Sequence, residues 1–302
     1  MQHRLLVAMV LTVMTSSQAL SQAKYPPETK NAALRYWLAF AEMQDPPADK
    51  AKQDLLEKTS AGEAAWDEIS LGPILDANDG AIRTMQRATK LPECDWGLEY
   101  DRGVRAALPN LARARVMARL NQLAGMREMA KGDSQAAVNT WLAGVRFSQH
   151  LAAGGPLIFA LVAKSALLPN LRVLTSETQK GHLSATQRTQ VSKSLKALRE
   201  DGFNWAAAWG LEELTLEQFL VELRTSANPK PTYEAAVGEP FPAGAKIPDA
   251  ADADRFREYM GSVQTALNLP SAISRTRLAA LEPQQHALPE AIQRLIPSAE
   301  SK

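Results

Sequence analysis

Cysteine is almost absent from this sequence, since Cys94 is the only one in 302 residues. A single cysteine excludes an internal disulfide framework and every metal site that is built from several thiolates. Histidine is scarce as well, with four residues, and none of them forms the H-x-x-x-H spacing of a helical metal site. We therefore expect neither a metal site nor a cofactor.

An excess of charge of one sign is also missing. The chain carries 34 Lys and Arg against 33 Asp and Glu, a formal net charge of +1. Arg4 is the only charged residue before Lys24, so a chain that begins at Lys24 is neutral. This balance lacks the basic excess typical of nucleic-acid-binding proteins, and we expect no nucleic-acid partner. With 45% hydrophobic and 22% charged residues, the composition is that of a globular protein.

The N-terminus has the pattern of a cleaved export signal. Residues 5–14 (LLVAMVLTVM) form an apolar stretch after a short basic region, and Ser21 and Ala23 place small residues at positions −3 and −1 of a cleavage site. Ala19 ends a second possible site. About ten apolar residues are too few to cross a membrane, which takes roughly 20. We therefore predict a signal peptide over residues 1–23, with cleavage near Ala23 and export to the periplasm or the medium.

A second apolar stretch, residues 155–174, contains Lys164, Asn170 and Arg172. These polar side chains interrupt the run, so we interpret it as the central buried helix of a helical domain. We expect no membrane span in the mature chain.

Apolar residues recur at helical spacing over most of the chain, and no segment alternates as a strand does. The pattern predicts an all-α fold of stacked antiparallel helical hairpins, solenoid-like or bundle-like, in a single main domain. Helices are expected over residues 29–43, 108–131, 134–151, 155–174, 184–200, 205–224 and 253–267. The predicted organisation is a helical domain at 24–227, a Pro-rich loop at 228–249, a C-terminal helix at 250–281 that packs on the domain, and a loose tail at 282–302.

One pair of predicted helices is similar to a tetratricopeptide hairpin. With Gly132 at the turn, Gly125, Ala137 and Trp141 fall on the small, small and aromatic positions of that 34-residue repeat. Shifting the frame by one repeat in either direction gives no second copy. The hairpin is therefore a single degenerate one, and a regular array is not predicted.

Several short motifs also occur in an order that resembles exported, uncharacterised all-helical bacterial proteins. They are Asn31 to Trp37 (NAALRYW), Cys94 to Trp96 (CDW), Leu108 to Leu111 (LPNL) before an Arg-rich helix, Lys131 to Asp133 (KGD), the helix that follows Gly155 and Pro156, and Leu183 to Gln187 (LSATQ). The resemblance covers roughly residues 30–225, and Asn110 stands where the pattern has an aromatic residue or His. It implies an all-helical fold and export, and it implies no activity.

The long helix predicted over residues 108–131 places Arg115 and Arg119 in the middle of its apolar stripe. A buried cation needs a carboxylate partner, and Glu212 and Glu213 lie in another largely apolar predicted helix. Two interpretations follow: an internal ion-pair cluster that sets helix register, or an anion-binding pocket whose guanidinium groups hold a carboxylate or phosphate.

A second cluster contains Cys94, Asp95 and Trp96. Asp95 and Glu99 share a face if this segment is helical, which is a spacing that can pair a general acid with a base. Cys94 has Glu93 and Asp95 as sequence neighbours, and we expect these acidic residues to raise the pKa of the thiol, which disfavours a nucleophile. We interpret the segment as a structural loop that docks Trp96 into the core.

Two hypotheses for the function remain. The sequence contains no P-loop, G-x-G-x-x-G or G-x-S-x-G, which favours a non-catalytic interaction or scaffold protein that binds a protein or peptide partner. The alternative is a hydrolase of unfamiliar type that uses Asp95, Glu99, Glu212 and Glu213 around an anion pocket formed by Arg115 and Arg119.

Overall fold

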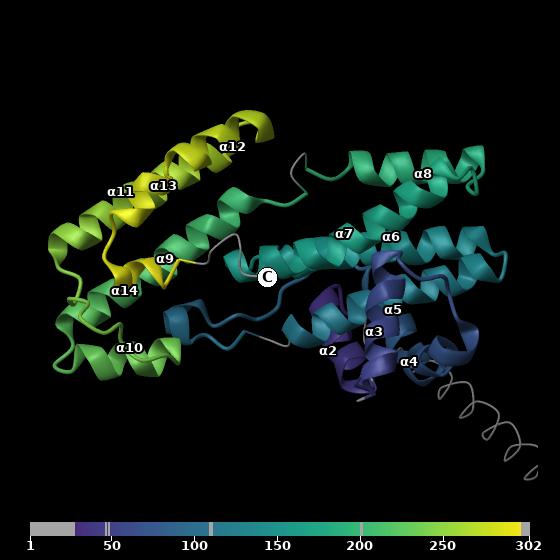
Figure 1. Ribbon diagram of the computed structural model, residues 1–302, viewed down its shortest axis with the longest axis horizontal. Helices are drawn as coiled ribbons and strands as arrows, with labels where there is room; N and C mark the ends of the chain where they lie inside the picture. Colours follow the sequence, from purple (N-terminus) through teal and green to yellow (C-terminus); the bar gives the residue numbers. More distant parts are fainter. Residues whose placement is uncertain (1–27, 46, 48, 109–110, 200–201, 297–302) are drawn as a thin grey trace, which may run out of the picture. The chain divides into compact units, whose positions relative to one another are not determined.

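The computed structural model describes residues 28–296 except 46, 48, 109–110 and 200–201. Within this part of the chain it contains thirteen α-helices, one 3₁₀ helix and no strand (Figure 1). The described residues from Asn31 onward form one compact unit. The all-α class and the single main domain are thereby confirmed. The predicted signal peptide lies outside the described residues.

Many helices begin at a residue whose side chain accepts a hydrogen bond from the first turn, as Asn31, Asp67 and Asp133 do. The predicted capping box of Ser184 and Gln187 is present. The elements are α2 (Ala32–Glu42), α3 (Lys50–Ala61), α4 (Glu68–Ala88), η1 (Tyr100–Arg105), α5 (Leu111–Ala130), α6 (Ser134–Ala152), α7 (Leu157–Gln179), α8 (Ala185–Lys196), α9 (Trp205–Thr225), α10 (Pro229–Val237), α11 (Ala250–Leu267), α12 (Ser271–Ala280), α13 (Glu282–His286) and α14 (Glu290–Gln293).

A first hydrophobic core lies among α2 to α8. Tyr36, Trp141, Phe147 and Phe159 are at most 1% exposed there. Helix α6 contacts both α5 and α7, while α2 packs on α4. This core holds most of the aromatic contacts of the described chain. In one of them, Trp96 stacks on Tyr36 at a distance of 5.6 Å between the ring centroids.

The α5–α6 hairpin turns at Gly132, whose φ of +84° lies in the left-handed region. An ideal Cβ on Gly125 would lie 2.3 Å from Nε1 of Trp141, so only glycine lets the two helices approach this closely. The Trp141 indole donates to the carbonyl of Gln122 at 3.1 Å. The small and aromatic residues singled out in the sequence therefore form the contact between the two helices.

Helix α7 occupies the centre predicted for the second apolar stretch. Of the described helices it alone is long and apolar enough to cross a membrane by length and composition, and 50% of its apolar window is buried inside the protein. It contacts α5, α6 and α9. These contacts support the interpretation of α7 as a core helix.

A second hydrophobic core lies around α9, α10, α11 and α14. Phe219, Tyr233, Phe256 and Ile292 are at most 2% exposed in it. The start of α7 reaches this core through Leu157. Helix α9 contacts α7, α10 and α11, and so joins the C-terminal helices to the rest of the domain.

The prediction of a Pro-rich loop over residues 228–249 is wrong in its first half, because α10 forms there. Pro229 stands at the first helical position, where a missing N–H costs nothing and the fixed φ suits a helix. Gly238 ends the helix with a φ of +78°. Tyr233 in its middle is fully buried, and this burial decides the conformation.

The prediction of a loose tail is also wrong for the described residues up to 296. Helices α13 and α14 form, and Leu288, Ala291, Ile292 and Ile296 are buried in the second core. The predicted C-terminal helix is two helices, α11 and α12, because Pro270 stands before the start of α12. The prolines end the helices in this region, but the apolar residues between the prolines still pack into the second core.

Candidate functional site

Arg115 and Arg119 are exposed, which corrects the prediction that both face inward. The Arg119 side chain is 45% exposed and its Nη1 lies 3.8 Å from Oε1 of Glu57 on α3. No ion pair joins either arginine to Glu212 or Glu213 among the described residues. The predicted cluster of two arginines and two glutamates is therefore not formed.

The error lies in which face of α5 is buried. Met117, Leu120 and Leu123 of α5 are buried, but the centre of the buried face carries small and amide side chains, namely Ala114, Ala118, Asn121 and Gly125. Counted at about 100° per residue, it is roughly 120° away from the most apolar stripe of the helix. Small residues let α6 approach closely, so here fit to the neighbouring helix, and not hydropathy, decides which face is buried.

Glu212 has a different role from the predicted one. Its Oε2 accepts a hydrogen bond from the backbone N–H of Leu157 at 3.2 Å, at the first residue of α7. Pro156 precedes this residue and has no side-chain oxygen of its own to cap the helix, so Glu212 supplies the acceptor from α9. Burial raises the pKa of Glu212, while burial and the neighbouring Glu217 raise the pKa of Glu213.

The segment with Cys94 and Trp96 is the structural loop that we predicted. The Asn31 side chain accepts from the N–H of Asp95 and donates to its carbonyl, both at 2.9 Å. Trp96 is 5% exposed, and its indole donates to the carbonyl of His150 at 2.9 Å. The sequence expectation of a docked tryptophan is confirmed.

This loop does not carry the hypothetical acid–base pair. Residues 94–99 are not helical, so Asp95 and Glu99 do not share a helix face. Asp95 accepts from the N–H of Gly97, and Glu99 pairs with Arg102 at 2.8 Å. Burial, and secondarily Asp95, raise the pKa of Cys94 to about 12, so this thiol is not a thiolate at neutral pH. The residues that the hydrolase hypothesis requires are thus engaged separately.

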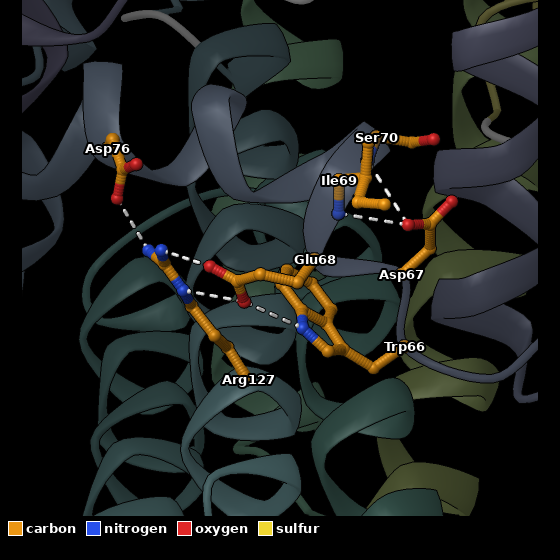
Figure 2. A network of polar contacts seen from close by, with 7 residues as sticks. All are labelled: Trp66, Asp67, Glu68, Ile69, Ser70, Asp76 and Arg127. Carbon is orange, nitrogen blue, oxygen red and sulfur yellow. Dashed lines mark hydrogen bonds and ion pairs between the residues drawn. The ribbon is translucent and has the colours of Figure 1, made fainter.

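Figure 2 shows a polar network that sequence reasoning missed. Arg127 of α5 donates from Nε to Glu68 at 3.1 Å, from Nη2 to the same carboxylate, and from Nη1 to Asp76 at 2.6 Å. Trp66 donates its indole N–H to Glu68 at 3.0 Å. Because every charge here has a partner, we interpret this network as a tie between the start of α4 and the end of α5.

A cationic concavity lies between α4, α6 and α8, and we call it the basic groove. It has a volume of about 810 Å³. Five of its lining residues are cationic and none is acidic. Its lining residues are Arg83, Gln86, Arg87, Thr89, Lys90, Asn139, Thr140, Leu142, Ala143, Arg146, Gln190, Lys193, Ser194 and Ala197.

The cations of the basic groove differ in whether they have a partner. Arg83 pairs with Asp79, and Arg87 donates to Oγ1 of Thr84 at 2.9 Å. Lys90, Arg146 and Lys193 are exposed and form no ion pair with any residue that the structure describes. Like charges gathered without a counter-charge repel one another, so this surface favours an anionic ligand.

Side-chain amides lie between these cations. Oδ1 of Asn139 on α6 accepts from Nε2 of Gln190 on α8 at 2.9 Å, which links the floor of the basic groove to one wall. On the other wall, Nε2 of Gln86 donates to Oδ1 of Asn121 at 3.1 Å. Thr140 in turn donates to Glu128 at 2.8 Å. The amides are therefore held in place by bonds to neighbouring helices.

The sequence carries a weak signal for this site. Arg83, Arg87 and Lys90 follow the helical spacing of one face, as do Gln190, Lys193 and Ser194. Such faces are ordinarily solvated, and nothing in the local pattern shows that two of them flank α6. Among the described residues no group of three His, Cys, Asp or Glu is placed to hold a metal ion.

Comparison with known proteins adds no relative to this picture. No protein-family model, no curated protein and no solved structure matches the chain.

Proposed function

We propose that this protein is a non-catalytic helical interaction module whose basic groove binds an acidic, extended segment of a partner protein. The observation that carries the proposal is the set of five cations around one concavity without an acidic residue among its lining. Three of these cations, Lys90, Arg146 and Lys193, have no counter-charge in the described part of the chain. A partner with several carboxylates would supply it.

The amides favour a peptide over a nucleic acid. Oε1 of Gln86 and Nδ2 of Asn139 have no hydrogen-bond partner among the described residues, so they can pair with the N–H and C=O groups of an extended backbone. Leu142 and Ala143 add apolar surface to the floor. A net charge of +1 for the whole chain leaves the cations confined to a local patch, whereas nucleic-acid binding draws on a broader basic surface.

A binding role also fits the chemistry of the lining. The basic groove is lined by no carboxylate, histidine or cysteine, so the usual side chains of acid–base catalysis and of thiol nucleophiles are not at hand there. Contacts of exposed cations are each worth up to about 1 kcal/mol and are screened by salt. We therefore expect moderate, salt-sensitive affinity.

The test is the binding of a fluorescein-labelled, Glu-rich peptide of about ten residues, followed by fluorescence anisotropy. The double variant Arg146→Gln/Lys193→Gln should weaken binding by about tenfold, equivalent to about 1.4 kcal/mol. The matched control is Arg115→Gln/Arg119→Gln, which removes the same charge from exposed positions outside the groove and should leave the affinity within about twofold.

Equal losses in the two double variants would refute a specific groove, because they would indicate attraction by net charge alone. Tighter binding of a single-stranded oligonucleotide than of the peptide would refute the choice of partner. Raising the salt concentration should weaken peptide binding to the wild type more than to the groove variant, since the groove variant has fewer ionic contacts to screen.

We also propose that the mature protein is exported, on the strength of the N-terminal pattern. The test is the intact mass of the protein recovered from its own host. A mass that corresponds to a start at Lys24 supports cleavage after Ala23. Retention of residues 1–23 would contradict it.

A further inference from the structure

A pocket separate from the basic groove lies where η1 and the loop before it meet α7, α9, α10 and the chain after α14. It shares no lining residue with the basic groove. Its walls are mainly apolar, with Leu98, Val104, Ile158 and Leu216 among them. We call it the Glu212 pocket, after the carboxylate that lines it.

The other polar side chains of this pocket are already engaged. The Tyr100 hydroxyl donates to the carbonyl of Gly154, and the Thr215 hydroxyl donates to the carbonyl of Leu211 at 2.8 Å. Arg294 also lines the pocket, but its Nη2 lies 2.6 Å from Oε1 of Glu290 and the pair neutralises its charge. These groups therefore leave the pocket without a cation free to neutralise Glu212.

Glu212 itself is only partly satisfied. Its one hydrogen bond among the described residues is the 3.2 Å contact from the N–H of Leu157 to Oε2, and it forms no ion pair there. Glu212 is half-buried, and a carboxylate with a single long hydrogen bond and no cation loses part of its hydration there without a counter-charge, which costs free energy in an apolar setting. A ligand with a positively charged donor would remove that cost.

We propose that the Glu212 pocket binds a small primary amine with an alkyl or aryl body, its ammonium group on the Glu212 carboxylate and its apolar part against Leu98, Val104 and Leu216. The pocket has a volume of about 220 Å³. A 150 Å³ apolar cavity holds benzene, so this volume suits a ligand of roughly nine non-hydrogen atoms. The inference is independent of the proposed peptide-binding function.

The probe is phenethylamine, compared by isothermal titration calorimetry with 2-phenylethanol and 3-phenylpropionate. These three share the aromatic body and differ in the polar head. The amine should bind at least about tenfold more tightly than the alcohol and the acid. Equal or tighter binding of either, or no heat of binding from the amine at millimolar concentration, would overturn the proposal.

The variant Glu212→Gln keeps a carbonyl oxygen for the N–H of Leu157 and removes the negative charge. It should weaken amine binding by at least about tenfold, with an unchanged circular dichroism spectrum. The matched control is Glu213→Gln, the next residue on α9, which does not line the pocket and should bind within about twofold of the wild type. An affinity of Glu212→Gln within twofold of the wild type would refute the role of the carboxylate.

A second variant tests the pocket without altering Glu212. Ala236 of α10 lines it, and Ala236→Phe places an aromatic ring in the volume that the amine would occupy. We expect loss of amine binding in this variant as well. Retained binding in a folded Ala236→Phe protein would place the amine elsewhere and refute the site.

Discussion

At the scale of single residues, Gly125 and Arg127 of α5 show how close packing and charge act side by side. Gly125 lies against the Trp141 ring, where a Cβ would approach Nε1 to 2.3 Å. Two residues later, Arg127 has a side chain only 19% exposed and contacts two carboxylates. Position 125 requires a residue without a side chain, whereas position 127 requires a side chain with several hydrogen-bond donors.

Gly125→Ala should destabilise the protein by about 2–4 kcal/mol, because the added methyl group displaces Trp141 from its hydrogen bond with Gln122. The measurement is urea unfolding followed by circular dichroism. The control is Gly261→Ala on α11, where nothing beyond the adjoining residues and backbone of the helix itself lies within 4 Å of the added Cβ. That change should stabilise the helix by up to about 1 kcal/mol. Equal effects of the two substitutions would contradict the packing argument.

Arg127→Met should lower the free energy of unfolding by about 1–2 kcal/mol at neutral pH. In the wild type, the hydrogen bonds from Arg127 lower the pKa values of Glu68 and Asp76. A lowered folded-state pKa contributes stability that is present above the ordinary carboxyl value of about 4 and is lost as the pH falls through the folded value. The gap between wild type and variant should therefore close in acid.

Urea unfolding curves of the wild type and of Arg127→Met, recorded at neutral and at acidic pH, measure this difference in stability. Arg102→Met is the control, since Arg102 and Glu99 are 54% and 59% exposed and their pairing should contribute little. A gap for Arg127→Met that persisted in acid would show that the arginine acts through packing of its stem rather than through the two carboxylates.

At the scale of elements, the C-terminal helices show that short segments with prolines can be structural. Helix α14 spans only Glu290–Gln293, yet Ala291 and Ile292 are 0% exposed. Periodicity cannot mark so short a helix, because the pattern needs a window of at least about 11 residues. Its conformation follows from the second core that it completes.

Ile292→Ala should destabilise the protein by about 2–4 kcal/mol, as expected for a large-to-small change in a core. The comparison is Ile273→Ala on α12, where the side chain is 52% exposed and the change should stay within about 0.5 kcal/mol. Thermal or urea unfolding of both variants measures the difference. Matching small effects would mean that the segment after α13 does not contribute to the core.

At the scale of the whole molecule, two hydrophobic cores share one helix. Leu157 at the start of α7 belongs to the second core, whereas Phe159 and Val162 belong to the first. Trp205 at the start of α9 packs against both. A continuous helix that serves two cores couples their stabilities.

We therefore expect one cooperative unfolding transition, with tryptophan fluorescence and circular dichroism at coincident midpoints. Phe256→Ala, a change confined to the second core, should lower both midpoints together. The fluorescence chiefly reports the first core, because Trp37, Trp66, Trp96 and Trp141 pack there alone, whereas Trp205 packs against both cores and Trp209 lies in the second. A fluorescence midpoint that stayed at its wild-type position while the circular dichroism curve split would show that the cores unfold separately.

What the sequence determined by itself is local. Helical spacing, the capping box at Ser184, the turn at Gly132 and the docking of Trp96 could all be predicted, because they depend on neighbours in the chain or on one large apolar side chain. The export signal and the resemblance to exported helical proteins remain predictions of the same local kind.

What only the tertiary structure decided is which surfaces meet. The centre of the buried face of α5 is lined by alanine, glycine and amide side chains, so the hydropathy pattern pointed to the wrong side and placed Arg115 and Arg119 inward. The basic groove brings Arg83 and Lys193 together from helices more than a hundred positions apart in the sequence. Close packing requires that the surfaces of two helices have complementary shapes. The local sequence of one helix does not show which other helix it meets, so it cannot show which of its faces is buried.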